Sequence, residues 1–92
     1  MLKFTMLDMS TCHITKETND LLLKNSIGDV VYYQKPGYGF FIHIPDDLEE
    51  TENGDAPVDL YRCIKFALNN GCQWINMDCD GEEIEELPKY EW

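Results

Sequence analysis

Carboxylates are the most abundant side chains of this protein that could do chemistry. The 92-residue sequence holds 18 Asp and Glu against 7 Lys and Arg, which gives a formal net charge of −11 at pH 7. Most of the acids lie in two runs, 46–59 and 78–91, with seven in each. A surface of this charge repels nucleic acid and attracts basic proteins. The charge therefore predicts a basic protein surface as the partner, without direct binding of nucleic acid.

One acidic segment resembles part of a cation-binding loop. In Asp78-Cys79-Asp80-Gly81-Glu82, several oxygens could converge, as hard cations require. An EF-hand also needs ligands at further alternate positions and a Glu at the twelfth, which this segment lacks. We interpret Asp80-Gly81 as a hairpin turn.

Cysteine and histidine could supply the soft ligands of a zinc site. The candidates are Cys12, His13, His43, Cys63, Cys72 and Cys79. Because no Cys-x-x-Cys pair occurs among them, a site would have to be assembled from several elements. We expect four reduced thiols, no metal and no other cofactor. A zinc-stabilised protein-interaction domain remains the alternative function.

No sequence motif indicates catalysis. Cys12 and His13 are neighbours, and neighbouring side chains of an extended strand point to opposite faces. Pro36-Gly37-Tyr38-Gly39 is typical of a hairpin turn, and no helix follows it as one would follow a phosphate-binding loop. We therefore predict that the protein is not an enzyme.

The elements that must position these residues follow the order strand, helix, strand, strand, helix, strand. Patterning predicts strands over 2–7, 30–33, 38–44 and 72–78, a helix capped by Thr15 and ended by Gly28-Asp29, and a helix from Pro57 to Asn70 ended by Gly71. The strands 30–33 and 38–44 should form an antiparallel hairpin, and 72–78 should be central. An acidic loop fills 45–56, and a short acidic strand is expected around 83–87.

This order predicts a single α+β domain over residues 1–92. It is the ferredoxin-like split βαβ fold (β-α-β-β-α-β), with an extra C-terminal hairpin strand and two helices on one face of an antiparallel sheet. The chain has no apolar run of about 18 residues and its start is unlike a signal peptide. We expect a cytoplasmic protein without a membrane partner, either a monomer or a homodimer.

Two acidic patches and two aromatic residues are the predicted partner-binding site. On a strand, Glu83 and Glu85 would project from one side about 6.6 Å apart, which resembles the regular charge of a nucleic-acid backbone. Tyr and Trp anchor interfaces, although Trp92 could instead fold back over the sheet edge. The first acidic patch is Asp46, Asp47, Glu49, Glu50 and Glu52; the second acidic patch is Asp78, Asp80, Glu82, Glu83, Glu85 and Glu86, beside Tyr90 and Trp92.

Five segments carry a resemblance that covers nearly the whole chain. They are LDMSTCHIT (7–15), YGFF (38–41), NGCQWI (70–75), DCDG (78–81) and LPKYEW (87–92). Together they resemble a family of small uncharacterised bacterial proteins from plasmids, prophages and conjugative elements. Small acidic proteins of mobile elements are often inhibitors of host defence, and anti-CRISPR proteins are similar in size and charge. The resemblance implies an anti-CRISPR-like inhibitor that occupies the basic surface of a defence effector nuclease, such as an RNA-guided CRISPR effector, as a nucleic-acid mimic.

Overall fold

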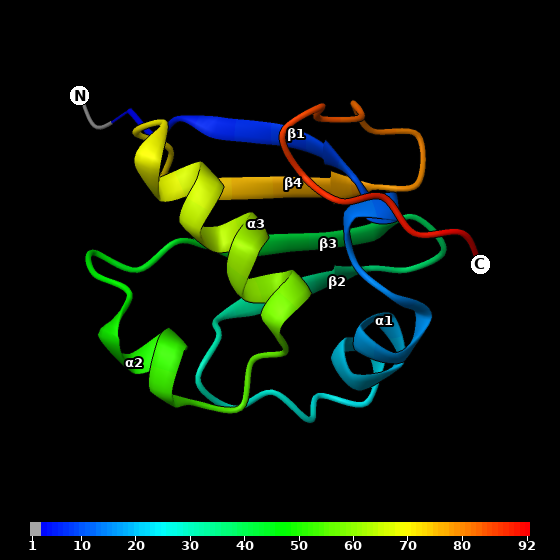
Figure 1. Ribbon diagram of the computed structural model, residues 1–92, viewed down its shortest axis with the longest axis horizontal. Coiled ribbons are helices and arrows are strands. Elements are labelled where there is room, and N and C mark those ends of the chain that lie inside the picture. Colours follow the sequence, from blue (N-terminus) through cyan, green and yellow to red (C-terminus); the bar gives the residue numbers. More distant parts are fainter. Residues whose placement is uncertain (1–2) are drawn as a thin grey trace.

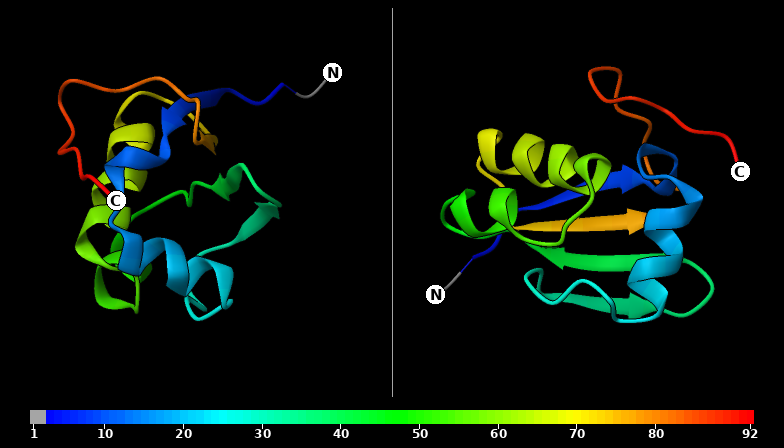
Figure 2. Two further views of the ribbon diagram at one scale, coloured as in Figure 1. Left: turned by 90° about the vertical axis from the view of Figure 1, so that its right-hand side faces the viewer. Right: turned by 60° about the horizontal axis from the view of Figure 1, so that its bottom comes forward.

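The computed structural model describes residues 3–92, apart from the side chain of Glu50, and consists of one sheet with helices against it (Figure 1). The elements in chain order are β1 (Met6–Ser10), the 3-10 helix η1 (Thr11–His13), α1 (Lys16–Leu23), β2 (Tyr32–Lys35), β3 (Gly39–His43), α2 (Glu49–Asn53), α3 (Val58–Asn69) and β4 (Trp74–Asp78). The α+β class is confirmed, and α1 and α3 lie on the same face of the sheet (Figures 1 and 2).

The strands are ordered β1-β4-β3-β2, so the last strand in sequence lies in the interior of the sheet. The antiparallel β2–β3 pairing and the central position of β4 are as predicted, but β2 covers Tyr32–Lys35 instead of 30–33. However, β1 pairs with β4 in parallel, so the sheet is mixed and the prediction of an antiparallel sheet is wrong at this pairing. The ferredoxin-like strand order is not confirmed. Periodicity identifies a strand, but its neighbours are chosen by packing between distant segments.

The first strand begins later than predicted. The pattern favoured 2–7, but β1 covers Met6–Ser10, where Met9 pairs with Met77 of β4 and is fully buried. Phe4, which the pattern placed in the strand interior, is 66% exposed. Leu2 lies outside the described residues. The strand register follows the side chains that reach the core.

The start of α1 is as predicted, and α3 begins at Val58, one residue after the predicted Pro57. The Thr15 hydroxyl caps α1 by accepting from the backbone N–H of Thr18 at 3.2 Å. This helix ends at Leu23, before the predicted Gly28-Asp29, because Asn25 adopts a left-handed φ of 54°. Pro57 precedes α3, and Gly71 follows it with a φ of 73°. The predicted acidic loop 45–56 contains the short helix α2.

Apolar side chains from both layers form one core between the sheet and the helices. Its largest fully buried members include Phe40, Met9, Ile14, Leu22, Ile42, Leu60, Ile64, Ile75 and Met77. These side chains lie on the helical side of the sheet. No helix or strand of the described chain covers the other face of the sheet (Figure 2). None of the helices in residues 3–92 combines the length and apolar character needed to cross a membrane.

Candidate partner-binding site

The C-terminal segment, residues 79–92, has no strand but is fastened to the rest of the fold. Its backbone crosses the β1 edge to the helical side of the sheet (Figures 1 and 2). Ser10 N–H donates to the Glu82 carbonyl at 2.8 Å, and Glu82 N–H donates to the Asp8 carboxylate at 3.0 Å. Gly81 allows this approach, because a Cβ there would lie 2.4 Å from the Met9 carbonyl oxygen. The segment therefore has a defined backbone path despite lacking secondary structure.

His13 fixes the middle of the C-terminal segment. Its ring is 1% exposed, with Nε2 2.8 Å from the Ile84 backbone nitrogen and Nδ1 2.8 Å from the Pro88 carbonyl oxygen. Since the Ile84 N–H donates, Nε2 accepts, and the ring proton on Nδ1 donates to Pro88. A neutral imidazole thus joins both sides of the turn 84–88. In the sequence His13 is only a zinc-ligand or catalytic candidate, because no local pattern shows which histidine will be buried.

The predicted acidic strand at 83–87 does not form. Leu87 N–H donates to the Ile84 carbonyl at 3.1 Å, so the backbone turns here, and Leu87 is buried. The prediction that Glu83 and Glu85 form a regular row along a strand is therefore wrong. The bond from the Leu87 N–H to the Ile84 carbonyl and the two bonds of the His13 ring satisfy these backbone groups in place of a sheet partner.

Most carboxylates of the second acidic patch are nevertheless exposed on this fixed backbone. Glu82, Glu83 and Glu85 face solvent. Glu86 is also exposed, but it lines the same surface hollow as Arg62 and Lys65 of α3, so two of the few bases lie near it. The exposed charge is consequently greatest at 80–85.

Asp78 has a structural partner. Lys35 Nζ lies 2.8 Å from Asp78 Oδ2 and 2.5 Å from Asn76 Oδ1. In the sheet, Gly39 stands between Lys35 and Asp78, and a Cβ at this position would collide with the Met77 carbonyl oxygen. The hydrogen bond from Lys35 is the main reason that the pKa of Asp78 is lowered from 3.8. Asp78 therefore has a structural role in the sheet, where it pairs with Lys35.

Residues 78–81 form a turn, but it is not the predicted hairpin turn, because no strand follows it. Gly81 N–H donates to the Asp78 carbonyl at 2.9 Å, and Asp80 N–H donates to Asp78 Oδ1 at 2.9 Å. Asp78, Cys79 and Asp80 are the one group of three potential metal ligands within residues 3–92 whose ligand atoms lie within 4.8 Å of one another. The Asp78 oxygens already accept from Lys35 and Asp80, which accounts for the cluster without a cation.

The first acidic patch lies at the other end of the sheet. Asp46, Asp47, Glu49 and Glu52 are exposed on α2 or just before it, and the side chain of Glu50 lies outside the described residues. This patch follows His43, which pairs with Trp74 at the start of β4, whereas the second patch follows Asp78 at its end. Figures 1 and 2 show α2 and the C-terminal turn at opposite ends. The two patches are separate surfaces.

The cysteines and histidines do not meet in one place within residues 3–92. Cys63 is buried and its thiol donates to the His13 carbonyl, while Cys79 and His43 are exposed. Burial raises the pKa of Cys63 to about 12, so its thiol stays protonated. All four cysteines are free. Both ring nitrogens of His13 are bonded to backbone, which leaves it neither a ligand position nor a base for Cys12.

Aromatic side chains are exposed on two sides of the molecule. On the uncovered sheet face, Tyr33 is 60% exposed and its ring lies 6.1 Å from that of Trp74. At the other location, Tyr38 and Trp92 are 61% and 54% exposed. Trp92 Nε1 donates to the Ile14 carbonyl at 3.0 Å, so this ring is held against the residue that follows η1.

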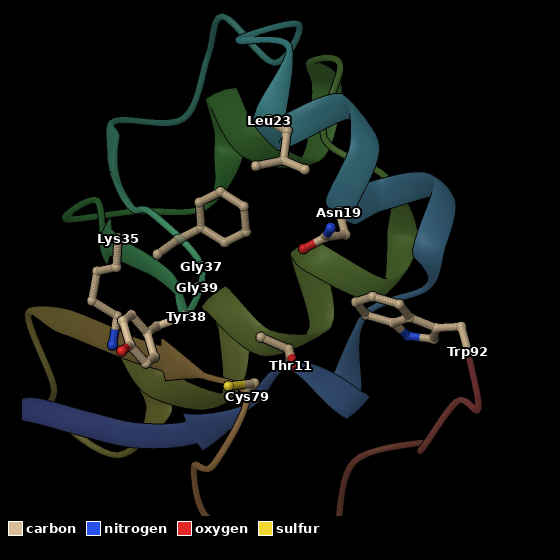
Figure 3. Close-up of a pocket in the computed structure, with 10 residues that line it drawn as sticks. Thr11, Asn19, Leu23, Lys35, Gly37, Tyr38, Gly39, Cys79 and Trp92 are labelled. Carbon is tan, nitrogen blue, oxygen red and sulfur yellow. The ribbon is translucent and has the colours of Figure 1, made fainter.

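Tyr38 and Trp92 border a cavity of about 270 Å³, called the apolar hollow below (Figure 3). Leu23 of α1, Phe40 of β3 and Cys79 also line it. The side chains of Leu23, Tyr38 and Trp92 surround its mouth from three sides. The hollow therefore joins the beginning and the end of the C-terminal segment to α1 and the β2–β3 turn.

Residues 6–92 match the family model described as the C-terminal domain of a family of unknown function, DUF5983. No curated protein and no solved structure matches the chain. Since the family match spans nearly all of the sequence, including every element of the fold and the whole C-terminal segment, this protein belongs to the DUF5983 family.

Proposed function

We propose that this protein is a non-enzymatic inhibitor that occupies the basic nucleic-acid-binding surface of a defence effector nuclease as a nucleic-acid mimic. The observation that supports this most directly is the C-terminal segment. Its exposed carboxylates at Asp80, Glu82, Glu83 and Glu85 stand on a backbone that His13, Ser10 and Asp8 hold in place.

A fixed backbone matters because binding by charge alone is weak when the charges must first be ordered. A segment that is already held loses less conformational entropy on association. Acidic charge increases the rate of encounter with a basic surface, and its effect falls as salt rises. An RNA-guided effector holds nucleic acid in a positively charged channel, which is the kind of surface that such a segment fits.

The second acidic patch, rather than the first, is the proposed contact. It has exposed aromatic neighbours, Tyr38 and Trp92, whereas the first patch lies at the opposite end of the sheet. Tyr and Trp are frequent anchors in protein interfaces. The non-enzymatic part of the proposal is supported by the protonated Cys63 thiol and by the two backbone bonds of His13.

Competition with nucleic acid tests the proposal. Purified guide-loaded effectors of several types are mixed with a fluorescein-labelled target duplex, and the anisotropy is followed as this protein is added. We expect displacement of the duplex from at least one effector, weaker at about 200 mM than at about 50 mM salt. The triple variant Glu82→Lys, Glu83→Lys, Glu85→Lys should raise the concentration needed by about tenfold or more.

The matched control reverses three charges of the first patch, Asp46→Lys, Glu49→Lys and Glu52→Lys. Both triple variants change the net charge equally, so only the position of the charges differs. Equal loss in the two variants would mean that total charge, not the C-terminal segment, determines inhibition. Absence of displacement from every effector by the unmodified protein at low salt would refute the mimic proposal.

A further inference from the structure

The apolar hollow gathers three of the exposed large apolar side chains of the described residues. Leu23, Tyr38 and Trp92 are 47%, 61% and 54% exposed, and they come from α1, the β2–β3 turn and the last residue of the C-terminal segment. Phe40, which is buried in the core, also lines the cavity. Clustered apolar surface on a small protein marks an interaction site more often than single exposed residues do.

The size of the hollow limits what can enter it. Its volume of about 270 Å³ lies just below the range of about 300–1,000 Å³ that is usual for pockets holding drug-sized ligands or cofactors. The exposed side chains of Leu23, Tyr38 and Trp92 line it, so it reaches the surface of the molecule (Figure 3). A cavity of this size and access suits one large side chain from another protein.

The charges around the hollow favour an apolar occupant. No acidic residue lines the cavity. Its single basic residue, Lys35, has its ammonium group bonded to Asp78 and Asn76. A charged side chain inside would lose hydration without gaining an ion pair, which is costly. An apolar side chain would instead remove its own surface and that of Leu23, Tyr38 and Trp92 from water.

Acidic residues stand next to two of the lining residues in the chain. Asp80 follows Cys79, and Glu91 precedes Trp92; both are exposed. Together with the net charge of −11, they favour basic residues on either side of an inserted side chain. We infer that the hollow binds a single large apolar side chain, such as leucine, carried within a basic segment of the partner. This inference rests on the proposed function and specifies which part of the partner binds in the apolar hollow.

Two synthetic peptides test it, each with three lysines on either side of a central leucine or a central alanine. The protein carries Trp74→Phe, so that Trp92 is the only tryptophan and its fluorescence reports occupation of the hollow; calorimetry on the unmodified protein gives an independent affinity. We expect the leucine peptide to bind about tenfold or more tightly than the alanine peptide, because it alone fills the cavity.

Two tyrosines of equal exposure provide the matched variants. Tyr38→Ser opens one wall of the hollow and should bring the ratio of the two affinities close to one. Tyr33→Ser, on the uncovered sheet face at 60% exposure, should leave the ratio unchanged. If both peptides bind in a salt-dependent manner but equally tightly to the unmodified protein, the hollow inference is wrong and the charge-based proposal stands. If neither peptide binds at low salt, the hollow inference is wrong, and the displacement of duplex from the effectors decides the proposed function separately.

Discussion

At the scale of single residues, His13 has the largest structural role that the sequence did not indicate. One buried ring accepts from Ile84 N–H and donates to the Pro88 carbonyl, and thereby fixes the turn that carries Glu85 and Glu86. Neutral imidazole suits this position because only the neutral ring has one donor and one acceptor. The backbone groups of a segment without secondary structure are satisfied by a side chain from η1.

Replacing His13 by alanine should loosen the C-terminal segment without unfolding the sheet. The Ile84 N–H and the Pro88 carbonyl would lose their partners, which costs about 1–3 kcal/mol for a buried polar group. We expect a lower free energy of unfolding in urea and faster hydrogen exchange at the Ile84 amide. His43→Ala is the control, since His43 is exposed and should lose less than about 1 kcal/mol. Unchanged exchange at Ile84 in His13→Ala would contradict the role given to the ring.

At the scale of elements, the acidic residues divide into those that hold elements together and those that face solvent. Asp59 in the first turn of α3 is 5% exposed and accepts from Thr15 N–H at 2.7 Å and from the Thr18 hydroxyl at 2.9 Å, so it ties α3 to the start of α1. Asp78 ties β4 to Lys35 of β2 across Gly39. Net charge in the sequence does not separate these two groups, because their roles depend on distant partners.

The Lys35–Asp78 pair predicts an acid-sensitive contribution to stability. Its hydrogen bond lowers the pKa of Asp78 below 3.8 in the folded protein. A lowered folded pKa means that the unfolded chain takes up the proton first, so the stabilisation is present above the unfolded pKa and is lost as pH falls through the folded value. In thermal melts, Asp78→Asn should lower the Tm near neutral pH, and the difference should shrink below about pH 4. A difference independent of pH would exclude the ion pair as its cause.

At the scale of the whole molecule, the excess charge is concentrated at two ends of the sheet rather than spread evenly. The first acidic patch lies on and before α2, and the exposed acids of the C-terminal segment lie at the opposite end (Figure 1). Arg62 and Lys65 of α3 partly offset Glu86. A net charge of −11 on a fold with a radius of gyration of 12.1 Å still repels itself.

Salt should therefore stabilise this protein. We expect the Tm to rise between about 20 and about 200 mM NaCl, because screening reduces repulsion among the exposed carboxylates. The rise should be smaller in the Glu82→Lys, Glu83→Lys, Glu85→Lys variant, which removes part of that repulsion. A Tm that falls with salt in the unmodified protein would show that favourable ion pairs outweigh the repulsion.

Local chemistry alone determined much of the secondary structure and the acidic character of this protein. The Thr15 cap, the β2–β3 hairpin, the helix between Pro57 and Gly71 and the turn at Asp80-Gly81 follow from side-chain capping, turn residues and periodicity, all of which act over a few positions.

Only the tertiary structure decided how these elements meet. The parallel pairing of β1 with β4, the burial of His13, the pairing of Asp78 with Lys35 and the turn in place of a strand at 83–87 all join residues far apart in the sequence. Such contacts depend on which surfaces pack and which backbone groups find partners, and no local pattern encodes them. The apolar hollow exists for the same reason, because folding alone brings Leu23, Tyr38 and Trp92 together.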